Sequence, residues 1–563
     1  MVSEDFVHQA RRWSGATRHD CIAPNGMVAS KHSLISEAGV KIMKKGGNAV
    51  DAAVAAAFMD TVVEPGMNGI GGEGVMTIHL ASGKNIVIDY VGRPSANSVP
   101  DMYEMETSSE PGWMGWKKVK DDANVNGYKA CVVPGTVAGL SLALEKYGTM
   151  KLRDVIEPAA KMAEEGFTVG WWTADHIFRR MEAFSKYPEW RRLYLKDGKF
   201  PYLPYTDELA TPHVLRNPEL ATCLRDIING GPEVFYNGWI AETIASDMAK
   251  NGGLLTEEDF AAYAPILVEP EPGTYRGYEV VYDPTHSGTT LMQILNIMEG
   301  YDLKKMGYGS AEALHIVSEA IGLAFADRFK YMGDPGYIDV PQKAMVSKEY
   351  AAKLMERIDP KKATAIEPGD PWPYEPECTT ALTAADKDGN MVAVNQTLVN
   401  SFGSGIVIPG TGIVMNNAMY GLNPEPGTAN SIDGRKRRIQ NVCPTIVLRD
   451  GEAYMALGAP GGRNIQVSVA QAIHYVIDYG MGIQDAVDAP RVTRETKTVY
   501  LDSRFPAPVR DKLAAMGHDV SYIDPELKSW GRPIGVLRDD FTGLLHGGVY
   551  SLLTGFESMA VGY

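Results

Sequence analysis

The sequence predicts an α+β protein in which helices flank antiparallel strands. Residues 379–397 form two predicted strands joined by a tight turn, because residues 387–390 supply turn formers between runs of Thr, Ala, Leu and Val. Residues 75–80 and 84–89 make a second predicted hairpin. Residues 311–331 show the apolar spacing of a long amphipathic helix.

The N-terminal part adds further helices. Residues 33–60 predict two core helices separated at Gly46-Gly47, and residues 139–147 and 152–165 show helical spacing. The glycine-rich run at 69–74 lacks the Lys-Ser/Thr of a phosphate loop, so we interpret it as a close-packed turn before a strand.

Two stretches have no single interpretation from pattern alone. The aromatic and basic residues 184–205 could line a substrate entrance or pack a helical layer, and we favour packing. Residues 359–377 are rich in Pro, Lys and Glu and predict a poorly structured linker that leads to the central hairpin.

The C-terminal part continues with strands and a helix. Residues 402–407 and 412–417 are expected to extend the sheet, and a strand at 454–457 precedes a buried helix at 466–479. The basic run at 435–438 is of a kind that usually faces solvent, but here it could border a pocket and attract an anion.

Composition excludes several classes of protein. The 563 residues are 45% hydrophobic, which allows a large core, and the formal net charge of -16 disfavours nucleic acid as a partner. No apolar run has the length of a membrane span, and residues 1–13 lack the apolar core of a signal peptide. We therefore expect a cytoplasmic protein that binds neither nucleic acid nor membrane.

The five cysteines are odd in number and scattered, which favours reduced thiols over a disulfide framework or a zinc site. Among them, Cys378 stands out because it directly precedes the first strand of the central hairpin.

Hydroxyl groups gather at the open end of this hairpin. Pairing about the turn places Thr379 roughly opposite Thr397. A threonine becomes a nucleophile if the chain is cut just before it, because its own α-amino group, with a pKa near 8, can then accept the hydroxyl proton. Alone, a Thr-Thr pair at a strand start indicates only strand propensity.

The motifs around this hairpin resemble those of the γ-glutamyltranspeptidase family. The run 379–397, the sequence FGSG at 402–405 and several further pieces occur in the order of that family and span almost the whole chain. The further pieces are GGNAVDAA at 46–53, GIGGEG at 69–74, VPG at 133–135, PTIV at 444–447, GAPGG at 458–462, DAPR at 488–491 and the terminal GY.

This resemblance implies a fold and an activation step. The family fold is a four-layer αββα sandwich with two stacked, mainly antiparallel sheets, that of an N-terminal-nucleophile hydrolase. By analogy, the chain would cut itself between Cys378 and Thr379, giving a large subunit of residues 1–378 and a small subunit of residues 379–563 within one interwoven unit.

The resemblance also implies roles for individual residues. Thr379 would be the nucleophile and Thr397 would hydrogen-bond and orient it. Gly461 and Gly462 would present backbone N–H groups to the developing oxyanion. Arg93 matches the arginine that holds a substrate carboxylate, for which the two-point guanidinium fork is suited.

Departures from the family pattern bear on the substrate. The transpeptidases carry His, Asn or Glu, an acid and a serine pair where this chain has Ala381, Val399, Gly421 and Gln440-Asn441. Because a buried ammonium without acidic partners is costly, these changes disfavour the usual γ-glutamyl recognition. The loop before Pro444 is also short, and an open pocket favours hydrolysis over transfer.

The sequence therefore predicts an amidohydrolase or acylase of this family that cleaves a small amide bearing a carboxylate, with Arg93, Gln440 and Asn441 binding the substrate. Two alternatives remain: a true γ-glutamyltranspeptidase or glutathione hydrolase, and an unprocessed, catalytically silent binding or scaffold protein. We expect no cofactor and no metal, and the sequence leaves association beyond the subunit pair open.

Overall fold

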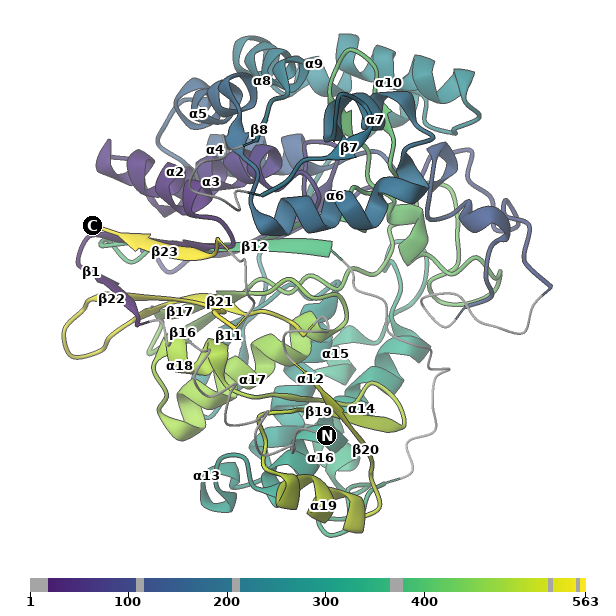
Figure 1. The fold of residues 1–563 in the computed structure, drawn as a ribbon. Coiled ribbons are helices and arrows are strands. Elements are labelled where there is room, and N and C mark those ends of the chain that lie inside the picture. Colours follow the sequence, from purple (N-terminus) through teal and green to yellow (C-terminus); the bar gives the residue numbers. More distant parts are fainter. Residues whose placement is uncertain (1–18, 108–115, 205–212, 365–377, 525–529, 553–556) are drawn as a thin grey trace, which may run out of the picture.

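Two seven-stranded antiparallel sheets lie face to face, and a layer of helices covers the outer side of each (Figure 1). The computed structural model describes residues 19–107, 116–204, 213–364, 378–524, 530–552 and 557–563. The predicted α+β sandwich with αββα layers is confirmed. The first 13 residues and most of the predicted linker at 359–377 lie outside the described residues.

The sheet that contains the central hairpin, called here the β12 sheet, has the hairpin at its centre. Its strands, in spatial order, are β23 (Met559–Gly562), β2 (Gly26–Ser30), β12 (Cys378–Asp386), β13 (Met391–Val399), β3 (Glu73–His79), β4 (Asn85–Tyr90) and β9 (Ile266–Val268).

The second sheet, the β17 sheet, packs beneath it in Figure 1. Its strands, in spatial order, are β1 (Cys21–Ala23), β22 (Leu545–Val549), β21 (Ile534–Arg538), β17 (Glu452–Gly458), β16 (Thr445–Arg449), β11 (Tyr278–Val281) and β10 (Gly273–Tyr275).

Helices from the first half of the chain cover the β12 sheet. They are α2 (Ser33–Lys44), α3 (Ala49–Val63), α4 (Thr136–Tyr147), α5 (Leu152–Glu165), α6 (Trp171–Phe184), α7 (Pro188–Tyr194), α8 (Pro218–Gly230), α9 (Glu233–Tyr236), α10 (Trp239–Lys250) and α11 (Glu257–Ala261).

Two later groups of helices lie on the side of the β17 sheet. They are α12 (Ser287–Glu299), α13 (Leu303–Met306), α14 (Ala311–Tyr331), α15 (Gln342–Met345), α16 (Lys348–Met355), α17 (Asn464–Tyr479), α18 (Ile483–Asp488) and α19 (Ala507–Ala515).

Short elements complete the chain. Three are short 3-10 helices: η1 (Lys120–Asp122), η2 (Tyr128–Ala130) and η3 (Ala418–Gly421). A three-stranded sheet consists of β18 (Val492–Thr493), β19 (Thr498–Asp502) and β20 (Asp519–Ile523). Two strand pairs are β5 (Phe167–Thr168) with β8 (Val214–Leu215) and β6 (Leu195–Lys196) with β7 (Phe200–Pro201).

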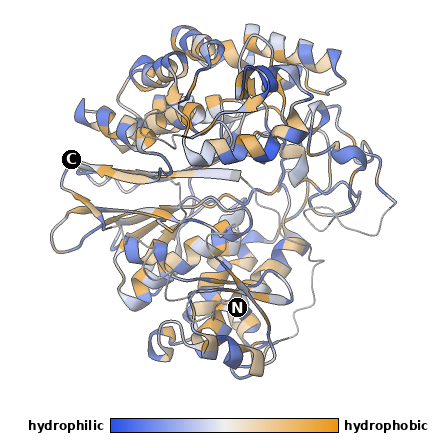
Figure 2. Ribbon diagram, in the orientation of Figure 1, coloured by the Kyte–Doolittle hydropathy of each residue, from blue (hydrophilic) through white to orange (hydrophobic). Residues whose placement is uncertain are grey.

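Small side chains fill the space between the sheets. On β12, Ala381 and Ala385 face the β17 sheet, whereas Leu382 and Ala384 face the helical layer. This alternation follows from the two-residue period of a strand. In Figure 2 the strands of both sheets are mostly pale to orange, while blue, hydrophilic positions gather on the outer helices. The close sheet contact holds the hairpin rigidly.

The buried helix α3 anchors the hairpin from above. Asn48 caps its N-terminus and Asp51 completes a capping box. The next amide, that of Ala49, donates to Asp386 Oδ2 in the hairpin turn, at 2.9 Å. Most predicted helices and strands are found within a few residues of their expected bounds, and 311–331 and 152–165 coincide with α14 and α5.

One prediction about the sheet is wrong. Residues 402–417 do not extend it, because β14 (Val407–Ile408) and β15 (Ile413–Val414) pair only with each other. Backbone φ angles of 58° at Phe402, 53° at Gly403 and 77° at Gly405 turn the chain away from the ladder. The segment instead packs beside the glycine-rich run, where a side chain on Gly71 would lie 2.1 Å from the carbonyl oxygen of Val414.

The aromatic side chains of residues 184–205 that the structure describes pack within the helical layer, which is the interpretation that we favoured from the sequence. Trp190 and Tyr194 are buried, and their rings contact Phe402 at centroid distances of 5.6 and 4.6 Å. Within the described part of the chain, no helix combines the length and apolar character that a bilayer crossing needs.

Candidate active site

Thr379 lies where β12 leaves its regular pairing with β13. Thr380 pairs with Gln396, a register that would place Thr379 opposite Thr397 as predicted. The register then shifts by one residue between Cys378 and Thr380, as at a β-bulge, so Thr379 has no direct partner in the ladder. Bulges commonly redirect a side chain next to an active site. Thr379 is buried, at 4% exposure.

A buried ion pair holds the strand next to this shift. Lys31 Nζ donates to the carbonyl oxygen of Thr379 at 3.3 Å and lies 3.6 Å from Glu64 Oε1. The hydroxyl of Thr380 donates to Glu64 Oε2 at 2.8 Å. Sequence reasoning missed Lys31 and Glu64, whose only signal is a charged residue inside an apolar segment.

Asp60 lies close to the same ion pair. Burial raises the pKa of the Asp60 carboxyl well above its usual range, and repulsion by Glu64 adds to this effect. The Asp60 carboxyl accepts from Asn68 Nδ2 at 2.9 Å.

Thr397 stabilises the C-terminal end of β13. Its Oγ1 accepts a hydrogen bond from the backbone N–H of Val399 at 2.8 Å. Val399 has a φ of 82°, a conformation that a β-branched residue rarely adopts and that surrounding structure must enforce. Strain of this type is typical of functional sites.

Gly461 and Gly462 form the turn between β17 and α17, with φ angles of 132° and 56°. Their carbonyl oxygens accept from the amides of Asn464 and Ile465, which starts the helix. Neither glycine N–H has an acceptor among the described residues. Two such donors at a helix N-terminus make a ready site for negative charge.

Asn395 connects this turn to the candidate nucleophile. Its side-chain amide donates to the carbonyl oxygen of Thr380 at 3.1 Å and to that of Ala459 at 2.8 Å. One bond therefore reaches β12 beside Thr379, and the other reaches the loop that enters Gly461. Sequence reasoning did not single out Asn395.

Arg93 follows the hairpin of β3 and β4, as predicted. Its backbone forms a bridge with Val133, with hydrogen bonds of 3.3 and 2.9 Å. The side chain is half-buried, and its guanidinium has no hydrogen-bond or ion-pair partner within the described residues. It is therefore available for an anionic ligand.

Gln440 and Asn441 belong to internal networks. Gln440 Nε2 donates to Glu73 Oε1, which also accepts from the Nε and Nη2 groups of Arg438 at 3.0 and 2.7 Å. Asn441 Oδ1 accepts from Arg328 Nη2 at 2.9 Å. Both residues are buried, at 2% exposure.

The basic run at 435–438 turns inward after its first residue. Arg435 is exposed, whereas Lys436, Arg437 and Arg438 are buried. Arg437 pairs with Asp89 and Asp334, and His286 adds a contact with Asp89 at 3.3 Å. Burial alone would lower the pKa of His286, but Asp283 and Asp89 outweigh it and raise the pKa.

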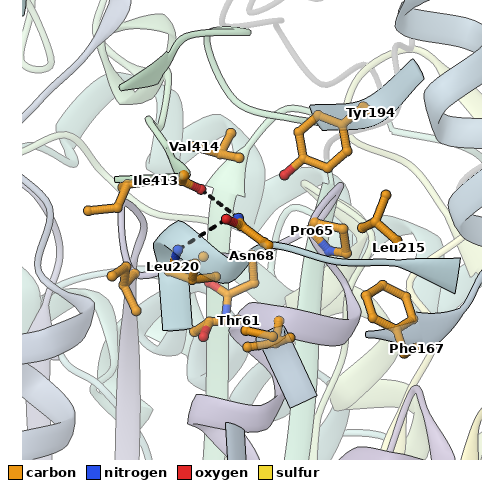
Figure 3. Close-up of a pocket in the computed structure, with 15 residues that line it drawn as sticks. Thr61, Pro65, Asn68, Phe167, Tyr194, Leu215, Leu220, Ile413 and Val414 are labelled. Atoms are coloured by element: carbon orange, nitrogen blue, oxygen red, sulfur yellow. Dashed lines mark hydrogen bonds between the residues drawn. The ribbon is translucent and has the colours of Figure 1, made fainter. Parts of the chain in front are cut away.

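A small cavity lies in the helical layer near the glycine-rich run (Figure 3). Its volume is about 20 Å³, and apolar side chains such as Phe167 and Leu215 make much of its wall. Asn217 spans the polar side, where it donates to the Gly412 carbonyl and accepts from the Leu220 amide. A space of this size holds about one water molecule and no substrate.

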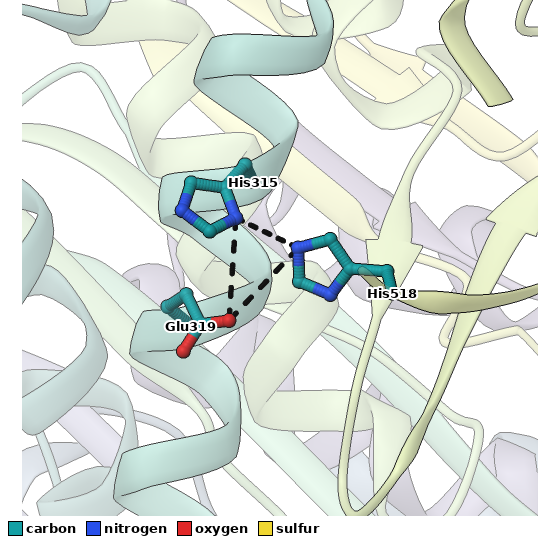
Figure 4. Close-up of side chains that lie close together, drawn as sticks. All are labelled: His315, Glu319 and His518. Atoms are coloured by element: carbon teal, nitrogen blue, oxygen red, sulfur yellow. Dashed lines mark hydrogen bonds and ion pairs between the residues drawn. The ribbon is translucent and has the colours of Figure 1, made fainter. Parts of the chain in front are cut away.

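A second cluster of ionisable groups lies on α14 and at the residue just before β20 (Figure 4). His315 Nδ1 and His518 Nε2 are 2.7 Å apart, and both rings approach Glu319. Glu319 already accepts from Arg494 and from the amide of Thr364. Because Arg494 balances the carboxylate and the two rings share a hydrogen bond, we interpret the cluster as a packed polar network. The expected absence of a metal stays a prediction.

The family model for gamma-glutamyltranspeptidase matches residues 35–548. This protein belongs to the γ-glutamyltranspeptidase family. Glutathione hydrolase proenzyme of Escherichia coli is 39% identical over 87% of this chain and 82% of its own length. Acylase ACY 1 proenzyme of a Pseudomonas species is 39% identical over 92% and 89%.

Solved structures of the family agree with this placement. Cephalosporin acylase from Bacillus halodurans superposes with a TM-score of 0.86, covers 98% of both chains and is 30% identical. γ-Glutamyltranspeptidase of Helicobacter pylori covers 61% of this chain with a TM-score of 0.55 and 38% identity. The chain is thus a hydrolase of amide C–N bonds with the N-terminal-nucleophile fold, and the predicted family and its acylase side are confirmed. Its proenzyme relatives imply processing into a large and a small subunit.

Proposed function

We propose that this protein cuts itself before Thr379 and then hydrolyses an amide bond of a small carboxylate-bearing substrate through an acyl-threonine intermediate. In the first stage, the Thr379 hydroxyl attacks the carbonyl carbon of Cys378. The peptide C–N bond breaks as the ester forms, and water then hydrolyses the ester to release residues 1–378 and 379–563.

In the second stage the new α-amino group of Thr379 accepts the hydroxyl proton while the oxygen attacks the substrate amide. The N–H groups of Gly461 and Gly462 hydrogen-bond the oxyanion, and the amine leaves with the proton. Water then attacks the acyl ester and regenerates the hydroxyl. Thr397 is assigned to orienting the nucleophile.

One observation carries the proposal. Asn395 ties the backbone beside Thr379 to the backbone that enters Gly461, with bonds of 3.1 and 2.8 Å. Acyl transfer needs a nucleophile at the carbonyl carbon and hydrogen-bond donors at its oxygen, and Asn395 joins the two segments that would supply them.

The unpartnered guanidinium of Arg93 supports a carboxylate on the substrate. Internal hydrogen bonds engage the side chains of Gln440 and Asn441, so their predicted role in binding the substrate stays a prediction. Hydrolysis is expected to exceed transfer to glycylglycine.

Glutathione hydrolysis is the second candidate, because a glutathione hydrolase is among the relatives at 39% identity. Rates on γ-glutamyl and glutaryl anilides separate the two. A cytoplasmic location, the absence of a cofactor and the association state beyond the subunit pair remain predictions.

The decisive experiment is denaturing electrophoresis and intact mass analysis of the purified protein and of Thr379→Ala. The wild type should give two fragments whose masses add up to the 61.3 kDa chain plus one water, and the variant should stay whole and inactive. A wild-type protein that turns over amides while Cys378 and Thr379 remain joined would refute the mechanism. An inactive, uncut wild type would favour the scaffold alternative.

A further inference from the structure

Arg438 fills space that a side chain at position 421 would otherwise occupy. A Cβ built on Gly421 would lie 2.4 Å from Arg438 Cδ and 2.5 Å from its Nη1. Real Cβ atoms do not come so close to other atoms, so Arg438 keeps this position only because residue 421 is glycine.

The Arg438 guanidinium is hydrogen-bonded through two of its nitrogens, whereas its third nitrogen has no acceptor among the described residues. Glu73 Oε1 accepts from Nε and Nη2 of Arg438, while Arg438 Nη1 is buried and has no hydrogen-bond partner among the described residues. An unsatisfied buried donor on a charged group is unfavourable, and a ligand oxygen that accepted from it would relieve this cost. The whole side chain is only 3% exposed.

The location of this donor connects it with the candidate active site. Glu73 pairs with Thr397 across the β3–β13 ladder, and its Oε2 accepts from the N–H of Gly92, the residue before Arg93. The Arg438 head group therefore rests on a residue that pairs with Thr397 through its backbone and holds, through its side chain, the glycine that precedes Arg93.

The charges around Arg438 decide what it can bind. Glu73 already balances the guanidinium, and Asp89 and Asp334 are engaged by Arg437. An ammonium group here would meet a cation whose carboxylate partner is already engaged. A neutral oxygen acceptor would satisfy Nη1 without adding charge to a buried site.

We propose that Arg438 Nη1 binds a hydroxyl or keto oxygen on the acyl chain of the substrate, next to the carboxylate that Arg93 holds. The substrate class is then the monoamide of an oxygen-substituted dicarboxylic acid. This inference rests on the proposed function and adds to it the chemical group that the acyl pocket selects.

Three p-nitroanilides test this inference. Their acyl groups are α-hydroxyglutaryl, glutaryl and γ-glutamyl, which carry a hydroxyl, a hydrogen and an ammonium group, respectively, at the same carbon. For the processed wild type, kcat/KM for the hydroxyl probe should exceed that for the glutaryl probe by about tenfold or more, as a hydrogen bond from a charged donor allows. The γ-glutamyl probe should be the slowest.

Arg438→Met keeps an unbranched aliphatic stem and removes the guanidinium with its charge. The hydroxyl preference should fall to about onefold, while the γ-glutamyl probe should gain about tenfold or more relative to the glutaryl probe, because Glu73 becomes an unbalanced carboxylate that attracts an ammonium. Gly421→Ala, which displaces the guanidinium without changing any charge, should also abolish the hydroxyl preference.

Arg435→Gln is the matched control, because Arg435 belongs to the same run but is exposed. It should leave all three ratios unchanged. A wild-type hydroxyl preference that survives in both Arg438→Met and Gly421→Ala would overturn the inference while leaving amide hydrolysis intact. A processed wild type that cleaves none of the probes would overturn the inference together with the proposed substrate class.

Discussion

At the scale of single residues, Asn395 links the two sheets at the point where chemistry is proposed. It is fully buried, and its amide group donates to one carbonyl oxygen in β12 and to another in the loop directly after β17. Shortening it removes a donor from each of these two carbonyl oxygens.

We expect Asn395→Ala to slow chain cleavage and amide turnover together, by about 10- to 100-fold, since each unpaired buried carbonyl costs about 1–3 kcal/mol and the turn at Gly461 loses its link to Thr379. The time course of cleavage on a gel and the kcat of the processed enzyme measure these effects.

Asn217→Ala provides the control, because Asn217 is also a buried amide with two backbone partners but lies beside the water-sized cavity. It should lower the melting temperature and leave the kcat of the processed fraction within about twofold. Equal loss of kcat in both variants would show that Asn395 acts only through stability.

At the scale of elements, the Gly461-Gly462 turn joins a central strand to the buried helix α17. The backbone of Gly531 lies against it, and a Cβ on Gly461 would come within 2.5 Å of the Gly531 Cα. The φ of 132° is also unfavourable for any other residue.

Gly461→Ala should therefore move the turn and cost about 100- to 1,000-fold in kcat, the range seen when one oxyanion donor is lost. Kinetics on a small acyl anilide measure this loss. Gly480→Asn, at the other end of α17, is the comparison: Gly480 has a φ of 70°, which Asn tolerates, and nothing within 4 Å of a built Cβ. If both variants kept wild-type kcat, the turn would have no part in catalysis.

The sequence predicted these elements well where the signal was local. Turn residues and strand formers define the hairpin at 379–397, and apolar spacing locates α5 and α14. The register of Thr380 with Gln396 also follows from the turn. The shift beside Thr379 does not, because it depends on contacts with β2 and with Lys31.

Contacts between distant residues were beyond sequence reasoning. Lys31 contacts Thr379, and Glu64 contacts Thr380, although each pair is more than 300 positions apart in the sequence. No local sequence pattern predicts such a contact. Gln440 was predicted from its place in a motif, but only the fold shows that its amide group and Arg438 both donate to Glu73 Oε1. The prediction that residues 402–407 and 412–417 extend the sheet was wrong, because three positive φ angles turn the chain away despite the β propensity of its residues.

At the scale of the whole molecule, buried histidines link stability to pH. His315 Nε2 faces the carbonyl oxygen of Asp359, so this nitrogen carries the proton and His315 Nδ1 accepts from His518. Burial, with Arg494 adding, lowers the pKa of His518 to about 3, and its Nδ1 has no partner among the described residues.

The folded protein therefore binds a proton at His518 less readily than the unfolded chain, whose histidines titrate near pH 6.5. Stability from this group is fully present above about pH 6.5 and is lost as pH falls toward 3. Melting temperatures of the wild type and of His518→Gln between pH 4 and 8 should converge on the acid side, because glutamine does not titrate. Parallel curves would contradict this assignment.

Both sheets are built from strands on either side of residue 379. In the β12 sheet, β2 lies between β23 and β12, and in the β17 sheet, β1 and β11 flank strands that come later in the chain. After the proposed cut before Thr379, each fragment would lack strands that its own sheets require, so we expect that neither fragment folds without the other. Thermal inactivation of the matured enzyme is then a one-way event whose half-life, rather than an equilibrium constant, measures its durability.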